Sequence, residues 1–494
     1  MKADRYFLYA ALAVLFVSCA KGDYFMKGMP YMEAAADMNG MPASPEESAG
    51  EGDRFDAIVE NDFIRTADQP VSTFSVDADG ASYAYMRRCI ESGWLPSGGA
   101  VRIEEYLNYF TFDYPDPEDG SDVAINAEVG PCPWNTQNKL LRLGIKGKSI
   151  PEDKVPQANF VFLIDVSGSM SSNDKLPVLK QGLQIMLDYM RPDDRVAVVT
   201  YASGEKLVLD STPVSEKGKI VAAIKDLQAS GSTAGARAMQ LAYDIATRNF
   251  IQGGNNRVIM GTDGDFNVGV TSTDALVEMV ENYAGRGIYL TVCGFGMGNL
   301  NDSMMESISN SGNGTYEYID SELEMTKVFV NERSRFVAVA NDCKAQVTFD
   351  PETVESYRLI GYENRVMSSE DFENDRKDAA EIGSGQTITA LYEIVPVSGP
   401  AGSPGKFAFR YKKALGDQSI PLEMDIPQAG ETVSESFDFA ASLAAWGMTL
   451  RESKYRGTAN LEMAIELARK SLSFDPYGLR AQHLKLLEKA REIK

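Results

Sequence analysis

The stretch Asn159 to Met170, NFVFLIDVSGSM, constrains the fold of this chain most strongly. Its first six residues form an apolar run that is too short for a helix and rich in branched and aromatic side chains, which predicts a buried strand. The run stops at Asp165, and Ser167 and Ser169 follow on either side of Gly168. Because open α/β sheets place ligand sites at the carboxyl ends of their strands, we expect these three side-chain oxygens at such an edge. Oxygens gathered on one turn are typical of a hard-cation site.

Taken alone, the same pattern is compatible with a serine that caps the next helix. Two later stretches favour a ligand site. Residues 230–235, SGSTAG, form a small-residue loop before a helical pattern and add a third hydroxyl, that of Thr233. Residues 257–260 predict another buried strand, and Asp263 follows it within the stretch GTDGD. A second carboxylate is therefore expected at the same edge of the sheet.

The three parts, D-x-S-x-S, a threonine in a glycine-rich loop and T-D-G, resemble the metal-ion-dependent adhesion site of von Willebrand factor type A domains. All five positions of that site match. The ligands that the resemblance implies for Mg²⁺, or for Mn²⁺ or Ca²⁺ in its place, are Asp165, Ser167, Ser169, Thr233 and Asp263. With PVSTFSVDADGASYAYMRR ahead of this domain, the chain also looks like bacterial lipoproteins that hold such a domain between an N-terminal region and a C-terminal region of unknown function.

Residues 155–335 alternate strand and helix patterns, which predicts the doubly wound, mostly parallel α/β sheet of the type A fold. The predicted strands are Asn159–Asp165, Arg195–Tyr201, Lys206–Asp210, Arg257–Asp263, Ile288–Phe295 and Thr315–Ile319, and the last predicted helix of this domain is Ser321–Ser334. The period then changes to two, so residues 336–432 predict an antiparallel β domain. Strand patterns of the same kind at 122–145 indicate that the α/β domain is inserted in, or flanked by, a β-sandwich-like domain.

The outer segments complete the predicted organisation. Residues 63–150 predict an N-terminal α+β region, and residues 433–494 predict a C-terminal region of amphipathic helices. Residues 20–62 are rich in Gly, Pro, Met and charged side chains without a sustained period, which favours a flexible linker.

Residues 1–19 have the pattern of an export signal. Lys2 and Arg5 precede an apolar stretch that is too short to span a bilayer, and Cys19 follows it. The sequence LFVSC resembles a lipobox, which implies a lipid on Cys19, although Phe16 stands where Leu is usual and ordinary signal-peptidase cleavage remains the alternative. We therefore expect a membrane-anchored lipoprotein of the bacterial cell envelope, periplasmic or surface-exposed, that contacts the membrane only through its N-terminal lipid.

Charge and histidine content exclude several classes of function. The chain has 494 residues and a formal net charge of −23, so nucleic acids and anionic membrane surfaces would be repelled. Its single histidine, His483, lies in a helical pattern and is predicted on the helix surface. Ser-His-Asp, Cys-His and HExxH chemistries therefore lack their parts.

An enzyme is the rival to a binding protein, since a metal ion near Asp265 could activate water for phosphoester hydrolysis. No lysine or arginine is expected beside the ligand loops to hold a phosphate, and Arg237, the nearest candidate, is predicted to be exposed. We therefore predict that the chain is not an enzyme and that its partner is a protein offering an acidic side chain to the metal. The other alternative is an interaction or assembly protein that does not use the metal.

Four cysteines follow Cys19 in the chain, and none forms a C-x-x-C pair, which argues against zinc. Cys293 lies in the apolar run Ile288–Phe295 and is predicted as a buried free thiol. Cys132 and Cys343 flank the α/β domain, and a disulfide between them is expected if the two flanking β segments form one sandwich.

Overall fold

In the computed structural model, the chain forms an α/β unit around a six-stranded sheet and two antiparallel sheets, with further helices at the two ends of the chain. The structure describes residues 53, 55, 57–76, 79–118, 120–232, 235–264, 273–297, 300–374, 379–399, 402–414 and 416–493. The export signal with Cys19, nearly all of the predicted linker, Thr233 and Asp265 lie outside these residues. Among the described residues no helix is both long and apolar enough to cross a membrane.

The α/β unit has a six-stranded sheet in the order β10-β9-β8-β5-β6-β7. Its strands are β5 (Ala158–Asp165), β6 (Arg195–Tyr201), β7 (Glu205–Pro213), β8 (Asn255–Thr262), β9 (Ile288–Phe295) and β10 (Tyr316–Ile319). All neighbours pair in parallel except β7, which pairs with β6 as an antiparallel hairpin. The predicted doubly wound, mostly parallel sheet is confirmed, with β5 at its centre.

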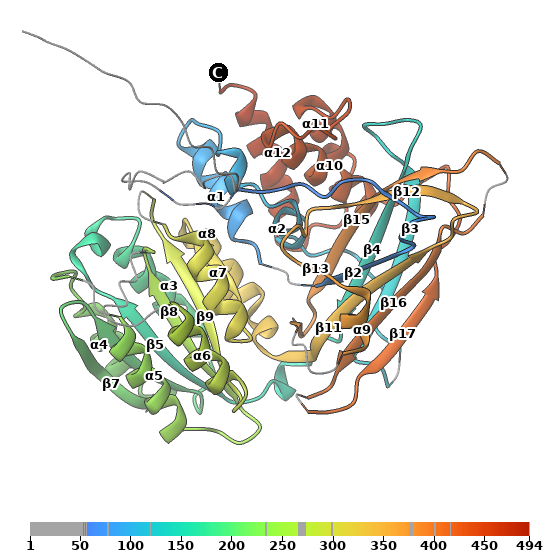
Figure 1. The fold of residues 1–494 in the computed structure, drawn as a ribbon. Coiled ribbons are helices and arrows are strands. Elements are labelled where there is room, and N and C mark those ends of the chain that lie inside the picture. Colours follow the sequence, from blue (N-terminus) through green and yellow to red (C-terminus); the bar gives the residue numbers. More distant parts are fainter. Residues whose placement is uncertain are drawn as a thin grey trace, which may run out of the picture. The chain divides into compact units, whose positions relative to one another are not determined.

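Helices cover both faces of this sheet, as Figure 1 shows. Successive side chains of a strand point to opposite faces, so Phe160 and Phe162 of β5 pack with α3 and α4, whereas Val161 and Leu163 belong to the core with α5, α6 and α7. These helices are α3 (Leu176–Tyr189), α4 (Lys217–Lys225), α5 (Ala236–Arg248), α6 (Thr273–Ala284) and α7 (Asp302–Ser311). Burial of β5 on both faces explains its unbroken apolar run.

The last predicted helix of the unit, Ser321–Ser334, is wrong as one continuous element. The α-helix α8 (Glu322–Thr326) gives way to a π-helical turn at Lys327–Asn331, where the amide of Glu332 donates to the carbonyl of Lys327 at 2.9 Å. The buried Lys327 ammonium lies 3.0 Å from the Glu332 carboxylate and 4.3 Å from the centre of the Tyr109 ring. The wider turn therefore accompanies a buried ion pair that periodicity alone does not reveal.

Two antiparallel sheets form a sandwich on either side of one apolar core. Their orders are β1-β12-β15-β4-β3 and β13-β2-β11-β16-β17, with β14 also paired to β11. The strands ahead of the α/β unit are β1 (Ile64–Arg65), β2 (Val71–Ser75), β3 (Val123–Pro131) and β4 (Lys139–Gly147). Those after it are β11 (Ala338–Phe349), β12 (Val354–Ile360), β13 (Val366–Met367), β14 (Ala380–Gly383), β15 (Thr387–Pro396), β16 (Gly405–Lys412) and β17 (Ile420–Asp425).

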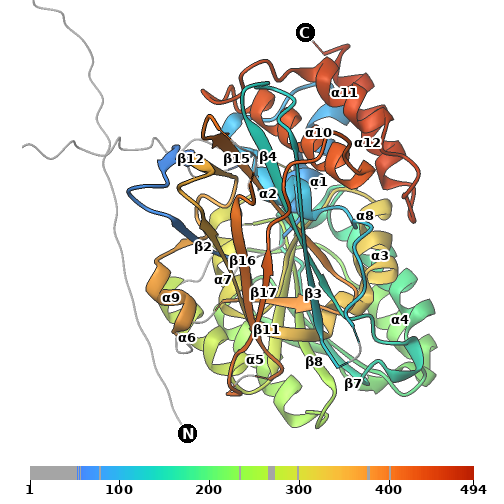
Figure 2. The ribbon, with the colours of Figure 1, turned by 90° about the vertical axis from the view of Figure 1, so that its right-hand side faces the viewer.

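Strands from the two ends of the chain therefore complete each other's sheets. β4 pairs with β15 over eight residues, and β2 pairs with β11 over five. The α/β unit is thus inserted into the sandwich between β4 and β11, and Figure 2 shows strands from both ends of the chain, β3 and β4 beside β15 to β17, running together.

The remaining helices are α1 (Ala81–Glu91), α2 (Ile103–Asn108), the short α9 (Ser369–Glu373), α10 (Glu435–Leu450), α11 (Leu461–Arg469) and α12 (Leu479–Ala490). The C-terminal helices α10 to α12 pack on one another and on α1 and α2. His483 of α12 is fully buried among Phe110 and Phe439, and the Tyr83 hydroxyl lies 2.9 Å from its Nδ1 atom. The prediction of a surface histidine is therefore wrong, because α12 is covered on the face that carries it.

The four described cysteines, Cys89, Cys132, Cys293 and Cys343, are all buried free thiols. The expected Cys132–Cys343 disulfide is therefore wrong, although the shared sandwich that motivated it is present. The physical reason is placement: Cys132 belongs to the core under the helices, and Cys343 belongs to the core between the two sheets. Cys293, in β9, is the buried thiol that its apolar run predicts.

Candidate functional site

The carboxyl end of β5 carries the first part of the site. Asp165 is fully buried, and its Oδ1 atom accepts a hydrogen bond from the Ser167 amide at 2.7 Å. A 3₁₀ turn at Gly168–Ser171 follows and places the Ser167 and Ser169 hydroxyls 2.9 Å apart. Ser167 is buried and Ser169 is exposed, so the pair of hydroxyls leads from the buried carboxylate towards solvent.

The second loop meets the first through the backbone. The amide of Ser230 donates to the carbonyl of Val166 at 2.7 Å, and the amide of Gly168 donates to the carbonyl of Gly231 at 3.1 Å. Gly231 has φ +87°, a left-handed conformation that favours glycine, and a Cβ atom there would come within 2.5 Å of the Ser203 hydroxyl. The loop that leads into Thr233 therefore lies against the D-x-S-x-S loop, while Thr233 itself is outside the described residues.

The third part follows β8, the strand next to β5. Asp263 is fully buried directly after the last residue of that strand, Thr262. Its Oδ2 atom accepts a hydrogen bond from the Lys175 ammonium at 2.8 Å, and the Lys175 side chain is only 9% exposed. The two aspartates and the Ser167–Ser169 pair thus come from the ends of adjacent strands, as expected from the sequence.

Lys175 corrects the statement that no lysine or arginine lies beside the ligand loops. The sequence carried one indication of it: Lys175 immediately precedes α3, where the helix dipole disfavours a cation unless a carboxylate balances it. Arg237, the candidate that the sequence offered, has a side chain 81% exposed and lies 3.7 Å from Glu205. It is therefore a surface residue, as expected.

The electrostatics of Asp165 differ from those of a surface carboxylate. Burial raises the pKa of Asp165 to about 6, the hydrogen bonds from Ser167 oppose that rise, and the negative charge of Asp263 adds to it. A hydrogen bond with the Tyr201 hydroxyl also lowers the pKa of Asp165, but it does not outweigh burial. A buried carboxylate at the end of a central strand, near two serine hydroxyls and a second carboxylate, fits a cation ligand.

The donor set is one of hydroxyls and aspartates. Among the described residues no group of three or more His, Cys, Asp or Glu side chains could hold a metal ion. At the strand-end site two aspartates supply the carboxylates, and serine or threonine hydroxyls would supply the further oxygens. Oxygen-only ligation of this kind suits Mg²⁺, Mn²⁺ or Ca²⁺ better than Zn²⁺.

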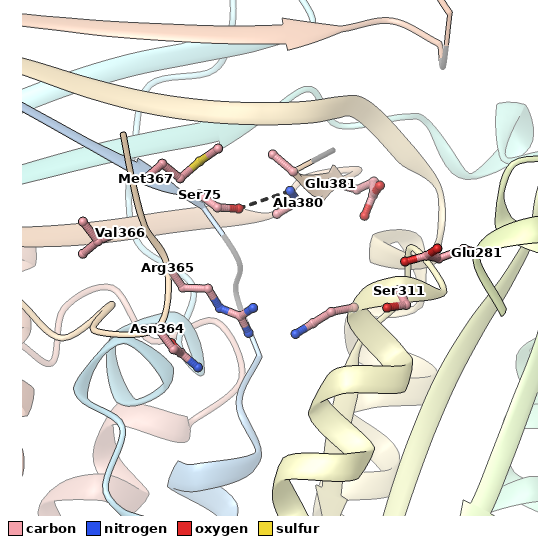
Figure 3. A pocket seen from close by; sticks show the side chains of 12 residues that line it. Ser75, Glu281, Ser311, Asn364, Arg365, Val366, Met367, Ala380 and Glu381 are labelled. Carbon is pink, nitrogen blue, oxygen red and sulfur yellow. Dashed lines mark hydrogen bonds between the residues drawn. The ribbon is translucent and has the colours of Figure 1, made fainter. Parts of the chain in front are cut away.

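A cleft of about 650 Å³ lies elsewhere, between the ends of α6 and α7 and the sandwich strands β2, β13 and β14. Figure 3 shows it with Arg365 and Asn364 on one side and Glu281 and Ser311 on the other. Arg365 and Asn364 both donate to Glu306, at 2.7 and 2.9 Å. Arg365 and Asn364 are thus engaged within the protein, and none of the described predicted ligands lines this cleft.

Comparisons with known proteins agree with this geometry. A model of the von Willebrand factor type A domain matches residues 160–265, another described as von Willebrand factor matches 49–142, and the model of the C-terminal part of the uncharacterized protein YfbK matches 334–407 and 400–493. The uncharacterized protein YfbK of Escherichia coli K12 is 37% identical over 466 residues, which is 88% of this chain and 81% of that protein. The chain belongs to the YfbK family of von Willebrand factor type A domain proteins.

More distant likenesses cover less. The uncharacterized protein sll0103 of Synechocystis is 26% identical over 197 residues, 39% of this chain and 45% of that protein. A von Willebrand factor type A structure from Catenulispora acidiphila is similar with a TM-score of 0.43 and 16% identity, over 75% of this chain and 91% of that one. The expected arrangement, a type A domain between an N-terminal region and a C-terminal YfbK region, is confirmed by the family matches.

Proposed function

We propose that this chain is a cell-envelope lipoprotein that binds a protein partner through a divalent-cation-dependent adhesion site. The observation that carries the proposal is the meeting of two buried carboxylates, Asp165 and Asp263, with the Ser167–Ser169 hydroxyl pair at the ends of β5 and β8. A buried charge in this state is costly unless a ligand satisfies it.

The residues that would hold the cation are Asp165, Ser167, Ser169, Thr233 and Asp263. A bound divalent cation would supply a position for an oxygen atom from outside the chain. The two aspartates provide negative charge, the hydroxyls add neutral oxygens, and the exposed Ser169 marks the solvent side from which an acidic side chain of the partner would approach. Binding without chemistry is the role that this set supports, so the proposal includes no enzymatic activity.

A specific contact favours a second candidate. Lys175 already supplies a positive charge to Asp263, so part of the site is neutralised without a metal. The second candidate is therefore an interaction or assembly protein of an envelope complex that does not use the cation. A metal-dependent hydrolase has the least support, since Lys175 at the site is engaged by Asp263 and the one histidine of the chain, His483, is buried on α12 against Phe110 and Phe439.

Melting temperature tests the metal directly. A cation that binds only the native state at a hundredfold its dissociation constant stabilises it by about 2.7 kcal/mol. We expect the full chain to melt higher in millimolar Mg²⁺ or Mn²⁺ than in EDTA, and Asp165→Asn to lose the difference. Asp226→Asn, an exposed aspartate after α4, removes the same charge away from the site and should keep it. Identical melting of the wild type in both buffers would favour the metal-independent candidate.

The partner and the membrane anchor need separate measurements. The wild type should capture a protein from envelope extract in Mg²⁺. It should not retain that protein in EDTA, and the Asp165→Asn variant should not capture it in either buffer. Mass spectrometry of the mature N-terminus should find a lipid on Cys19, and Cys19→Ser should leave the protein unprocessed or free of the membrane fraction. An unmodified N-terminus at another residue contradicts the lipoprotein.

A further inference from the structure

Lys175 is buried next to a predicted metal ligand, where a second positive charge is not needed to bind a cation. Its ammonium lies 2.8 Å from Asp263, one of the two carboxylates at the strand ends. The side chain is 9% exposed and that of Asp263 is fully buried. Since a buried lysine is rare unless it is paired, this ion pair is a built feature of the site.

The fold makes room for the stem of this lysine. Gly296, directly after β9, has φ +73°, and a Cβ atom there would come within 2.2 Å of Lys175 Cε and within 3.0 Å of its Cδ. The carbonyl of Gly296 accepts a hydrogen bond from the Tyr318 hydroxyl of β10 at 2.8 Å, which fixes this stretch of backbone. The stem therefore crosses the carboxyl end of β9 in a channel that any larger residue at 296 would close.

The backbone that carries Lys175 is anchored from outside the α/β unit. The neighbouring Asp174 makes an ion pair with Arg88 of α1 at 2.9 Å and accepts a hydrogen bond from the Ser172 hydroxyl at 2.6 Å. The start of α3 is thus held in place, and the ammonium is the part that can move, at the end of a flexible four-carbon stem.

The charges at this site favour either a lysine-paired, metal-free state or a cation-bound state, but not both together. The two aspartates carry two negative charges, of which the ammonium balances one. A divalent cation at the same carboxylates balances both, and an ammonium left beside it would be repelled. Asp263 can satisfy the lysine or the cation, and burial makes the choice sharper because water screens neither.

We propose that the Lys175 ammonium competes with the divalent cation for Asp263 and thereby sets the metal affinity of the site. This inference rests on the proposed function. In the metal-free state Lys175 balances the charge of Asp263, and we predict that cation binding moves the ammonium away from that carboxylate. The site then binds the cation only above a threshold concentration that the lysine determines.

Calorimetric titration of the full chain with Mn²⁺ alone tests the competition. Lys175→Met keeps an apolar stem of similar length and removes the charge, and its dissociation constant should fall by about tenfold or more, within the usual range of coupling between two sites. Lys175→Arg keeps the charge and should bind no tighter than the wild type. Lys219→Met, 61% exposed on α4, changes the net charge equally and should match the wild type within about twofold. Equal affinity of Lys175→Met and the wild type overturns the proposal.

Two measurements protect this test from a folding failure. Lys175→Gln keeps a hydrogen-bond donor for Asp263 without the charge and should show the same gain in Mn²⁺ affinity. In the wild type, amine acylation of Lys175 followed by peptide mass spectrometry should be slow in EDTA and faster in Mn²⁺, because the cation releases the ammonium. Unchanged labelling contradicts the proposal whatever the variants do.

The outcomes separate this inference from the proposed function. If the wild type and Lys175→Met bind Mn²⁺ equally and Asp165→Asn does not, the adhesion site stands and the role of Lys175 falls. If no variant binds Mn²⁺, both fall. If Lys175→Met binds and the wild type does not, the lysine holds the site closed, which supports the competition in its strongest form.

Discussion

Buried charges occur in two regions of this molecule and are satisfied to different degrees. At the junction between the α/β unit and α1, Arg87 donates to both oxygens of Asp320, at 2.7 and 2.5 Å, and to Glu324 at 2.6 Å. At the strand-end site, the Lys175 ammonium pairs with Asp263, and the nearby charge of Asp263 raises the pKa of the buried Asp165 carboxyl. The first arrangement holds two parts of the chain together, and the second keeps two carboxylates of like charge near each other.

A second junction cluster shows the same completeness. Arg102, just ahead of α2, lies 3.2 Å from Glu105, 2.6 Å from Asp302 and 3.0 Å from Glu306, and Arg365 lies 2.7 Å from Glu306. Burial of charge alone therefore does not mark a functional site in this protein. The distinguishing feature of the strand-end site is its composition: two buried aspartates, Asp165 and Asp263, lie at the ends of adjacent strands near two serine hydroxyls, and the Lys175 ammonium pairs with Asp263 alone.

The largest expected effect breaks the junction. Arg87→Ala leaves Asp320 and Glu324 buried without their guanidinium, which should lower the free energy of unfolding by about 3–5 kcal/mol. Urea denaturation followed by circular dichroism measures it. The response of melting temperature to Mg²⁺ should persist, because Arg87 contacts no predicted ligand.

An exposed pair is the matched control for that experiment. Arg469 lies 3.0 Å from Glu488, and both side chains are about half exposed, at 56% and 44%. Arg469→Ala should cost less than about 1 kcal/mol. A similar loss for Arg87→Ala and Arg469→Ala would mean that the junction pair does not stabilise the assembly of the two parts.

Acid provides the next effect, through His483. Burial lowers the pKa of His483 to about 3, so the folded chain keeps this ring neutral while the unfolded chain protonates it below about 6.5. Its contribution to stability is therefore present above pH 6.5 and is lost as the pH falls towards 3. Between pH 6.5 and 4 the loss should be about 3 kcal/mol. His483→Phe cannot titrate, so the free energy of unfolding of the wild type should fall relative to that of the variant as the pH falls. If the difference between the two free energies does not change with pH, the ring is not held neutral by burial.

The sequence predicts the α/β unit well because its signals are local. β6 and β9 have the predicted bounds, Arg195–Tyr201 and Ile288–Phe295, since both are apolar runs with turn residues at their ends. The sandwich also follows from its period of two. The pairing of β2 with β11, about 270 residues apart in the chain, could not be predicted. A period of two in the sequence indicates that a segment is a strand but does not indicate which strand it pairs with.

The candidate site divides in the same way. Asp165, Ser167, Ser169 and Asp263 follow predicted strands, so topology brings them together. The contact between Lys175 and Asp263 depends on how α3 starts and on the space above Gly296, which are tertiary facts. The surface prediction for His483 is wrong for a related reason. Helical periodicity identifies an apolar face, but it does not reveal that Tyr83, Phe110 and Phe439 cover the face that carries the histidine.

The smallest expected change in stability, that of Asp165→Asn, gives the most direct comparison between the strand-end site and the junction. Asp165→Asn and Asp320→Asn are matched changes, since each replaces a buried aspartate with its neutral isostere. Asp320→Asn removes the charge that two Arg87 donors need and should destabilise the protein in EDTA by about 3 kcal/mol or more. Asp165→Asn keeps an oxygen to accept from the Ser167 amide and removes a buried charge that Asp263 repels, so in EDTA it should be neutral or stabilise by about 1 kcal/mol.

Urea denaturation of both variants in EDTA, and again in millimolar Mg²⁺, decides the matter. A site kept for binding predicts that Asp165→Asn gains or holds stability without metal and loses the Mg²⁺ response, because the charge that destabilises the free protein is the charge that binds the cation. If Asp165→Asn instead costs as much as Asp320→Asn in EDTA, Asp165 is a structural charge like those of the junction. Buried charge would then stabilise both regions in the same way, and Asp165 would no longer indicate a ligand site.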